Sequence, residues 1–325
     1  RFILLFKTGE GREKAPLITE MVREIKHTID SLSAVRGHKI LLAVRVPVTV
    51  EGALDKGLDV KQWADEGLID FVTIGVHWPG DTGTPVAKFR KEFGHNEIPL
   101  YASIDDGGYL PREFYSDGMY RGRASHILGE GADGVYLFNY YFGDLYNRQQ
   151  NNLPLLEEGG LVRRTRTPEL LNEIGSLATL QGRNKIYCMS DGVTDAYRAL
   201  GAAQLPVAVS SGRATDLTVQ IADSLKSYTP EEMILFLRTD RPANINLEVN
   251  GTKITEQKPE YVHLYDRDRG MRPENRMYAY ILPAGSLHQG ENTIRMVDET
   301  LDNYFVVERV EMALKFGDVK THGYF

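Results

Sequence analysis

The chain has 325 residues, of which 42% are hydrophobic and 26% are charged, and its formal net charge is −7. This composition is typical of soluble globular proteins, and the length favours two domains. The negative charge argues against a nucleic-acid partner, because proteins that bind nucleic acid usually carry a basic face. No apolar run in the sequence approaches the ~20 residues that cross a bilayer, so we expect no membrane span.

The N-terminal part opens on an apolar run, a helix and a strand. The run "RFILLF" (Arg1 to Phe6) is typical of the end of a strand. A helix is predicted from Pro16 to Ser33, because proline suits a first helical turn and an apolar stripe follows it. The stripe consists of Leu17, Met21, Ile25, Ile29 and Leu32. The segment "KILLAVRVP" (Lys39 to Pro47) is a continuous apolar run, which predicts a strand buried on both faces.

Helices and strands then alternate as far as Tyr141, after which the pattern changes and one more helix and strand are predicted before Ser190. The predicted helices lie near Val60 to Glu66, at Val86 to Phe93, within Arg112 to Leu128 and around Glu169 to Leu180. The predicted strands are "IDFVTIGV" (Ile69 to Val76), "IPLYASI" (Ile98 to Ile104), "ADGVYLFNYY" (Ala132 to Tyr141) and "KIYCMS" (Lys185 to Ser190). Strands that alternate with helices pair in parallel through right-handed crossovers. The last of these strands is expected to close the first domain.

From about Leu205 onward the pattern indicates strands only. Apolar residues alternate along Ile245, Leu247 and Val249, which is typical of a half-buried antiparallel strand. A hairpin turn is predicted at Asn250-Gly251. Several such strands at regular spacing favour a β-sandwich of the jelly-roll kind. We therefore predict an α/β domain at residues 1–204 and a β-sandwich domain at residues 205–325.

Candidate functional residues lie where the predicted parallel strands end. In a parallel α/β barrel the chemistry gathers at the carboxyl ends of the strands, where the loops meet. Aromatic rings and hydrogen-bonding groups around carboxylates suit a sugar, so these ends predict a carbohydrate site. The residues are Arg45 in the first strand, His77 and Trp78 after the second, Tyr101, Ser103, Asp105 and Asp106 at the third, and Asn139, Tyr140 and Tyr141 at the fourth.

The two aspartates of "IDDGG" have two interpretations. Asp105 and Asp106 before two glycines form an acceptable turn. Strand alternation instead places Asp105 on one face with Ser103, and Asp106 on the other face with Ile104. Because the apolar face should meet the helices, Asp105 would point into the barrel mouth while Asp106 orients the turn. Both are candidate catalytic carboxylates.

The other candidates also have alternatives. Arg45 either pairs with a neighbouring acid or contacts a substrate. His77 lies beside Trp78 in a loop too polar for a core histidine, which favours a site role. Metal ligation by His77 is not expected, because no second histidine stands at helical spacing. Asn139 ends a buried strand and needs a polar partner there, which favours a role in the site network.

The sequence predicts no cofactor and no metal. No G-x-G-x-x-G motif follows a strand, and no phosphate-binding Walker loop is present. Cys188 is the only cysteine, which excludes an internal disulfide and a cysteine metal cluster. Its flanks indicate a buried small residue rather than a nucleophile. The segment "DRDRG" (Asp266 to Gly270) lacks the regular carboxylate spacing of a calcium loop.

The N-terminal part resembles a known family. The segments "LLAVRVP", "GLDVKQWADEGLIDFV", "IPLYASI" and "GADGVYLFNYY" resemble the second half of glycosyl-hydrolase-like TIM-barrel proteins, the family-ten-like glycosidases of polysaccharide-degrading bacteria. The resemblance spans roughly Arg1 to Tyr141, and a sheet domain similar to "INLEVNG…YAYILP…GENTIRMV" often follows such barrels. It implies that the chain holds the last four β/α units of a (β/α)8 barrel.

The resemblance also implies what would lie outside this chain. The first four units, with one catalytic acid, would precede Arg1 or come from a companion chain. The strand "IPLYASIDD" would be the seventh of the barrel, which commonly carries the nucleophile, with Asp where Glu is usual. A half-barrel alone would leave two sheet edges and a large apolar surface open, so we expect the chain by itself to aggregate or to need a companion.

These features together predict a glycoside hydrolase that acts on a poly- or oligosaccharide through two carboxylates. One alternative is a non-catalytic carbohydrate-binding protein in which the sheet domain binds the sugar. Tyr261, Tyr265, Tyr278 and Tyr280 would then offer stacking faces, although core packing suits Tyr278 and Tyr280 better. Another alternative is a structural interaction module. The family resemblance implies a periplasmic or extracellular location.

Overall fold

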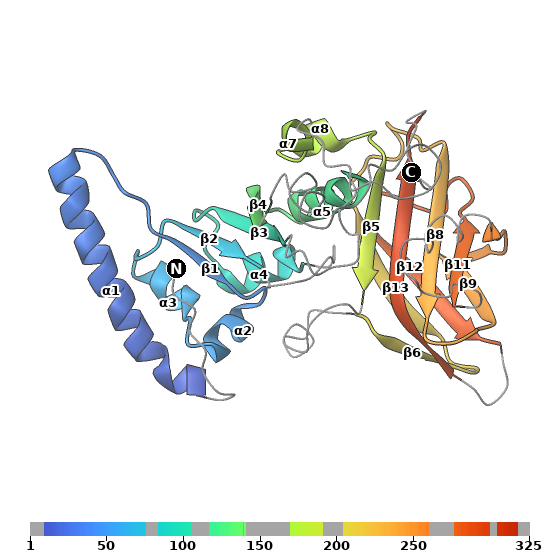
Figure 1. The fold of residues 1–325 in the computed structure, drawn as a ribbon, viewed down its shortest axis with the longest axis horizontal. Helices are drawn as coiled ribbons and strands as arrows, with labels where there is room; N and C mark the ends of the chain where they lie inside the picture. The colour runs from blue at the N-terminus through green and yellow to red at the C-terminus, as the bar shows by residue number, and fades with distance from the viewer. Residues whose placement is uncertain are drawn as a thin grey trace, which may run out of the picture.

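The computed structural model describes residues 10–75, 84–105, 117–138, 140, 170–190, 204–259, 276–299 and 304–317. Within these residues the strands form one parallel sheet and two antiparallel sheets (Figure 1). The mixed helix and strand content that the sequence predicts is therefore confirmed, and so is the parallel sheet. The complete barrel, the sandwich and the domain boundary after residue 204 stay predictions.

The parallel sheet has the strand order β1-β2-β3-β4. Its strands are β1 (Ala43–Val46), β2 (Phe71–Ile74), β3 (Leu100–Asp105) and β4 (Gly134–Phe138). The predicted parallel pairing of the first two strands is confirmed, since Ala43 lies opposite Phe71 and Val46 opposite Ile74. Every second residue of these strands is buried against helices in one hydrophobic core, for example Ile74, Ala102 and Ile104.

The connecting helices are α2 (Val50–Asp55), α3 (Val60–Asp65), α4 (Val86–Phe93) and α5 (Asp117–Gly129). Side chains cap two of them, because Thr49 accepts a hydrogen bond from Gly52 N and Asp59 accepts one from Gln62 N, each at 3.0 Å. Such caps satisfy amides that have no partner inside the helix. Gly94 ends α4 with φ +80°, a conformation that glycine adopts without steric cost. The predicted bounds of α4 agree with the structure.

The first helix, α1 (Glu10–Arg36), differs from its prediction in length and in its buried face. It begins before Pro16, which lies inside the helix. The start of α1 packs closely on the end of α2, where a Cβ on Gly11 would overlap the carbonyl oxygen of Asp55. Small side chains therefore form the contact between these two helices. The predicted apolar stripe is therefore not the buried face, and Leu17 is 66% exposed. The buried residues are instead Gly11, Ala15, Ile18, Thr19 and Val22.

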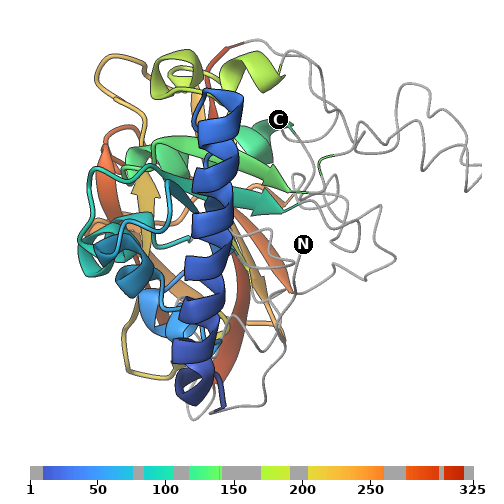
Figure 2. The same cartoon turned by 90° about the vertical axis from the view of Figure 1, so that its left-hand side faces the viewer.

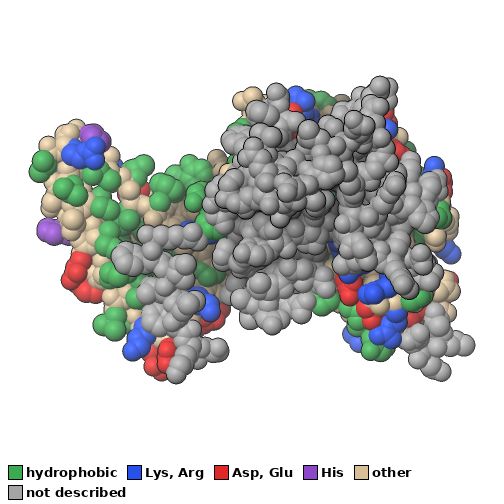
Figure 3. Space-filling model, viewed as in Figure 1, with side chains coloured by type: hydrophobic (Ala, Val, Ile, Leu, Met, Phe, Trp, Pro, Cys, Tyr) green, Lys and Arg blue, Asp and Glu red, His purple; other side chains and the backbone are tan. Residues whose placement is uncertain are grey.

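The first turns of α1 lie beside α2, and its far end projects away from the parallel sheet (Figure 1), so that the turned view looks onto this helix from the front (Figure 2). Hydrophobic side chains are visible along this helix in the space-filling view (Figure 3). Strand β1 lies at the end of its sheet in the order given above, and Ala43 is exposed while Leu41 just before it is 56% exposed. The prediction that this strand is buried on both faces is therefore wrong, because Ala43 is exposed and Val44 and Arg45 are only half-buried.

The segment that follows residue 169 also departs from the sequence prediction. One predicted helix is two short ones, α7 (Leu170–Glu173) and α8 (Leu177–Leu180). They are separate because Ser176 adopts an extended backbone and caps α8, accepting a hydrogen bond from Thr179 N at 3.3 Å. Strand β5 (Lys185–Ser190), which was expected to close the first domain, pairs antiparallel with β13 (Tyr304–Lys315) and belongs to an antiparallel sheet.

The remaining strands build two antiparallel sheets with the orders β10-β9-β12-β7 and β11-β8-β13-β5, and β6 pairs with β13. The two sheets share one hydrophobic core, which includes Leu217 and Ile294 from one sheet and Leu235 and Met312 from the other. The predicted hairpin turn is confirmed, with Asn250 at φ 50° and Gly251 at φ 78°. The strands are β6 (Val207–Ser210), β7 (Thr215–Ile221), β8 (Glu232–Thr239), β9 (Ile245–Val249), β10 (Thr252–Ile254), β11 (Met277–Ile281), β12 (Gly290–Asp298) and β13 (Tyr304–Lys315).

Helix α5 lies between the parallel sheet and the antiparallel sheets (Figure 1). It packs on β5 at Gly118 and Gly122, where a Cβ on Gly122 would overlap the carbonyl oxygen of Ile186. Two sequence predictions about buried residues are confirmed here and in the neighbouring sheet. Cys188 is fully buried, with its Sγ 3.9 Å from Glu311 Oε1, and Tyr280 is buried in the core.

The loop after α4 contains a histidine held between two carboxylates, which predicts a pH-dependent stability. His95 contacts Glu97 through Nδ1 and Asp65 through Nε2, each at 2.9 Å. The hydrogen bond to Glu97, followed by the one to Asp65, raises the pKa of His95. Because its pKa is raised in the folded state, the protonated His95 ring stabilises the folded protein. This contribution to the free energy of unfolding is complete below the unfolded pKa of about 6.5, and it is lost as the pH rises through the folded pKa.

We therefore expect the His95→Asn variant to be less stable than the wild type at pH 5.5 and nearly equal to it at pH about 9. Urea unfolding midpoints of both proteins across this range measure the difference. The matched control is His38→Asn, which changes an exposed histidine whose Nδ1 lies 3.3 Å from the Arg36 carbonyl oxygen. A difference between wild type and His95→Asn that stays constant with pH would contradict the assignment.

Candidate functional site

The face of the parallel sheet that points away from the helices carries polar and aromatic side chains. Neighbouring parallel strands place paired residues on the same face, and successive residues alternate. In the strand register, Arg45 of β1 lies opposite Thr73 of β2, and Thr73 lies opposite Tyr101 of β3. Two residues further along β3, Ser103 lies opposite Tyr136 of β4. The intervening row is apolar and lies in the core against the helices. This arrangement separates a helix-facing apolar side from a polar side.

Arg45 joins three strands on this polar side. Its Nη2 donates a hydrogen bond to Ser103 Oγ at 3.2 Å, and its Cζ lies 3.9 Å from the centroid of the Phe138 ring. A guanidinium over an aromatic face is attracted by the ring's quadrupole while its N–H groups remain able to donate in the plane. The side chains of β1, β3 and β4 therefore meet, and we call Arg45, Ser103 and Phe138 the arginine cluster.

A glycine at the end of β2 makes room for the arginine cluster. A Cβ on Gly75 would overlap Ser103 Oγ and lie 3.2 Å from Arg45 Nη2. Any larger residue there would push the serine hydroxyl away from the guanidinium. The amide of Gly75 itself bonds the carbonyl of Val46 at 3.0 Å, so the backbone stays part of the sheet. Glycine at this position therefore leaves the space through which the Arg45 side chain reaches across β2 to Ser103.

Aromatic side chains lie on the same face of the sheet, on both sides of the arginine cluster. Tyr101 packs edge-on against Phe71 with ring centroids 5.5 Å apart, and a Cβ on Gly134 would lie 2.7 Å from the Tyr101 ring. Tyr136 stacks with Phe138 at 6.4 Å and is 41% exposed. Rings that present a face to solvent beside hydrogen-bonding groups are the usual lining of sugar sites.

The end of β4 continues toward α5. Tyr140 packs edge-on against the buried Tyr120 of α5, with ring centroids 5.5 Å apart, and Arg123 lies 5.8 Å from the Tyr120 ring. Further along α5, His126 is buried, and its Nε2 lies 2.9 Å from the carbonyl oxygen of Thr84. Burial lowers the pKa of His126, which favours the neutral ring with its N–H on Nε2. This contact holds the start of α4 to α5.

The structure brings together some of the residues predicted from sequence. Arg45, Tyr101 and Ser103 share the polar face, as strand alternation predicts, with Arg45 and Ser103 in direct contact. Asp105 is the last residue of β3, and its backbone pairs with Phe138. The predicted residues His77, Trp78, Asp106, Asn139 and Tyr141 lie outside the described residues, as do Tyr261 and Tyr265. The functional roles of all these residues stay proposals.

Sequence reasoning missed Phe138, Tyr136 and Gly75. The sequence predicted that Asn139 and the residues after it contribute to the site from this strand. The ring that contacts Arg45 is instead Phe138, one residue earlier. Alternation along β4 could have found Tyr136 and Phe138, because they share a face two residues apart. Their position next to Arg45 needs the register of three strand pairs, which no local pattern contains.

The described residues contain no group of three or more histidine, cysteine or acidic residues that could hold a metal ion. Across the same part of the chain, none of the helices combines the length and the apolar character that spanning a membrane requires.

Comparisons with known proteins give only distant likenesses. No protein-family model and no curated protein matches the chain. Among solved structures, a β-porphyranase of glycoside hydrolase family 86 from the human gut bacterium Bacteroides plebeius is 12% identical with a TM-score of 0.29, over 95% of this chain and 75% of that one. BuGH86, solved in complex with neoagarooctaose, is 19% identical with a TM-score of 0.25 over 34% of this chain.

A cycloisomaltooligosaccharide glucanotransferase from Paenibacillus is 11% identical with a TM-score of 0.20, over 90% of this chain and 30% of that one. The matched part spans only 17% of BuGH86. All three proteins are named for their action on carbohydrates or were solved with one. At these identities and TM-scores the likeness carries no argument about this chain, whose function is argued below from its own residues.

Proposed function

We propose that this chain is part of a glycoside hydrolase that cleaves a poly- or oligosaccharide, with its substrate on the polar face of the parallel sheet. The observation that carries the proposal is the arginine cluster, in which Arg45 lies on the Phe138 ring and donates to Ser103. A fixed guanidinium offers directional donors to sugar hydroxyls, while Tyr136 and Phe138 offer apolar ring faces. We also propose a periplasmic or extracellular location for the protein.

In the proposed mechanism Asp105 supplies one of the two carboxylates. Its backbone pairs with Phe138, and it stands two residues beyond Ser103, so strand alternation would place the catalytic group on the face of the arginine cluster. Glycosidases need a second carboxyl group, ~5 Å away for retention of configuration and ~6.5–9.5 Å away for inversion. We propose that this second acid comes from the first half of a (β/α)8 barrel, of which β1 to β4 form the second half. Asp106 would orient the turn, and His77, Trp78, Asn139 and Tyr141 would complete the substrate contacts.

The alternative is a carbohydrate-binding protein without catalysis. The polar face supports that function as well, because the same ring and guanidinium contacts bind a sugar without cleaving it. Hydrolysis, rather than binding, separates the two. We therefore propose to assay the full-length protein on a panel of soluble polysaccharides, measuring reducing ends for cleavage and affinity electrophoresis for binding.

Arg45→Met tests the observation that carries the proposal, because methionine keeps the apolar stem but removes the guanidinium. We expect kcat/KM on a cleaved polysaccharide to fall by about 10- to 100-fold, the effect of losing one hydrogen bond from a charged group. The matched control is Arg23→Met on α1, where the arginine contacts Glu66 and Glu20 at 2.6 and 2.7 Å and lies on the helical side. It should leave kcat/KM unchanged.

Three outcomes would change the proposal. An Arg45→Met protein with wild-type kcat/KM would remove the arginine cluster from the site. A wild-type protein that binds a polysaccharide but releases no reducing ends would favour the carbohydrate-binding function. A protein that neither binds nor cleaves any member of the panel would favour a structural module.

A further inference from the structure

The far half of α1 leaves apolar side chains in contact with solvent. Between His27 and Arg36 every residue of the helix is exposed except Ile29 and Ser33, which are half-buried. Two of the exposed side chains are large and apolar, with Leu32 49% exposed and Val35 85% exposed. This half of the helix projects away from the parallel sheet (Figure 1), and hydrophobic side chains lie along it (Figure 3). Contiguous apolar side chains in solvent mark an interaction surface.

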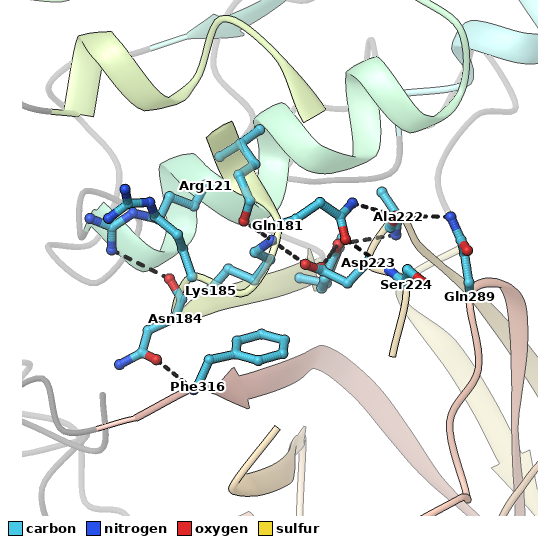
Figure 4. Close-up of polar contacts among 12 residues, drawn as sticks. Arg121, Gln181, Asn184, Lys185, Ala222, Asp223, Ser224, Gln289 and Phe316 are labelled. Atoms are coloured by element: carbon cyan, nitrogen blue, oxygen red, sulfur yellow. Dashed lines mark hydrogen bonds and ion pairs between the residues drawn. The ribbon is translucent and has the colours of Figure 1, made fainter. Parts of the chain in front are cut away.

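The buried charges of the antiparallel sheets, by contrast, have their partners within the chain. Lys185 Nζ lies 2.6 Å from Asp223 Oδ1 (Figure 4), and Tyr187 donates its hydroxyl proton to Asp223 Oδ2 at 2.8 Å. Lys185 donates as well to the carbonyl oxygen of Leu180 at 2.7 Å. Buried charges are tolerated when they are paired and hydrogen-bonded in this way. That cluster therefore calls for no further partner, whereas the exposed side of α1 does.

The apolar residues of α1 repeat with the spacing of a coiled coil. Positions that are alternately three and four residues apart fall on one narrow seam of a helix, and such a seam packs against a second helix. Side chains with this spacing are Ile18, Met21, Ile25, Thr28, Leu32 and Val35, of which only Thr28 is polar. Because Ile18 is buried in the chain's own core, we call the other five residues the α1 seam.

The α1 seam begins at the core of the parallel sheet and runs out into solvent. The near half of the helix is fixed on α3, where Trp63 Nε1 donates to Thr19 Oγ1 at 2.9 Å. Met21 packs against the core, Ile25 is half-buried, and the exposure is greatest at Val35. Helices in proteins gain most of their stability from packing of an apolar face rather than from helix propensity. Cover on the seam would therefore stabilise the far half of α1.

A second copy of the same helix fits the α1 seam. When two such helices lie antiparallel, the spacing places Met21 opposite Leu32 of the partner subunit and Ile25 opposite Thr28 of the partner subunit. The same two contacts recur on the other side of the two-fold axis, as in the isologous interface of a symmetric dimer. The seam is therefore complementary to itself.

The charges along α1 favour the antiparallel arrangement. From Glu10 to Glu24 the helix carries four glutamates and three basic residues, whereas the segment from Ile25 to Lys39 carries three basic residues and one aspartate. An antiparallel pair brings the more acidic half of one copy beside the more basic half of the other, and it also opposes the two helix dipoles. A parallel pair would instead bring the two basic halves together.

We propose that two copies of this chain associate through their α1 helices, which pair antiparallel along the α1 seam. A helix that covers the parallel sheet does not reach the far half of α1, because this half projects away from the sheet (Figures 1 and 2). A second α1 projects in the same way and matches its length. The contact spans only about four helical turns, so we expect a reversible dimer that depends on protein concentration.

Sedimentation equilibrium of the full-length protein between about 1 and 100 µM measures the association, and the mean mass should rise from monomer toward dimer. Leu32→Glu should raise the dissociation constant of the dimer by more than about 10-fold, because it places a carboxylate in an apolar contact. The matched control is Leu171→Glu on α7, which makes the same change at another exposed leucine and should dimerise as the wild type does.

Thr28→Leu is the second variant, and a folding defect cannot imitate its expected effect. The Thr28 hydroxyl donates within its own helix, to the carbonyl oxygen of Glu24 at 3.0 Å. Leucine at this position would make the α1 seam apolar throughout and would pack on Ile25 of the partner subunit. We expect the dissociation constant to fall by about 10-fold, because each copy buries additional apolar surface.

Disulfide cross-linking tests the orientation of the two helices. Met21→Cys and Leu32→Cys proteins are mixed and oxidised with diamide, and peptide mass spectrometry identifies the linked residues. An antiparallel pair gives the mixed disulfide between positions 21 and 32, whereas a parallel pair links each variant to itself. Cys188 is present in both proteins and is buried, so the wild type oxidised in the same way gives the background.

A wild-type protein that stays monomeric over the whole concentration range overturns the proposal. A Leu32→Glu protein that dimerises as the wild type does, or a Leu171→Glu protein that is weakened equally, would also exclude the α1 seam as the interface. Self-linked Met21→Cys and Leu32→Cys proteins would exclude the antiparallel arrangement. Polysaccharide hydrolysis does not enter these measurements, so their outcome is independent of the proposed function.

Discussion

Replacing Asp105 by asparagine is expected to lower the turnover of a cleaved polysaccharide by ~10²–10⁴-fold, the usual contribution of a positioned acid or base. The expectation rests on the proposed function and on strand geometry. Ala102 and Ile104 are buried in the core beneath the helices, and Ser103 lies on the opposite face with Arg45. Strand alternation predicts the same face for Asp105. The amide is similar to the carboxylate in size, which removes the charge and the proton while disturbing little packing.

The measurement is kcat for the full-length protein on a polysaccharide that it is shown to cleave, together with its melting temperature. Asp105→Asn should change kcat by orders of magnitude and the melting temperature little. Asp106→Asn is the neighbouring control, because the proposal gives that residue the orientation of the turn, and it should mainly reduce stability. Small and equal effects of both substitutions on kcat would return "IDDGG" to its alternative interpretation, a turn without catalysis.

Replacing Gly122 by alanine is expected to destabilise the protein by about 2–3 kcal/mol, in the range of an overpacked interior. A Cβ at this position would overlap the carbonyl oxygen of Ile186 and lie 3.1 Å from Tyr187 N. The obstacle is backbone of β5, which is held on its far side by β13 and cannot move aside as a flexible side chain does. Helix α5 would have to shift away from β5.

The matched control is Gly118→Ala, one turn earlier on the same helix face. A Cβ there would meet Ile186 Cγ1 at 3.5 Å, an ordinary contact. Because alanine restricts the unfolded chain more than glycine does, this variant should gain up to about 1 kcal/mol of stability. The free energy of unfolding in urea measures both effects. Equal changes in the two variants would show that helix propensity, rather than the close approach to β5, controls these positions.

The sequence by itself determined the local elements of this protein. The bounds of α4 and the hairpin at Asn250-Gly251 could be predicted, because an amphipathic period and a turn dipeptide are contained in a few neighbouring residues. The alternation of helices with apolar strands likewise predicted the parallel pairing of β1 with β2. For the candidate site, the alternation of β3 predicted that Tyr101 and Ser103 share one face of this strand.

Only the tertiary structure decided what these elements pack against. The pattern of β5 is compatible with either kind of sheet, and its pairing with β13 depends on residues more than a hundred positions away. The buried face of α1 follows from the close approach of Gly11 to the Asp55 carbonyl, whereas the apolar stripe alone favours a different face. In the same way, the contact of Arg45 with Phe138 and the pairing of Lys185 with Asp223 join segments that are distant along the chain. Periodicity records which residues avoid water, but register and partner choice are set by packing between segments, and no local window of the sequence contains both partners.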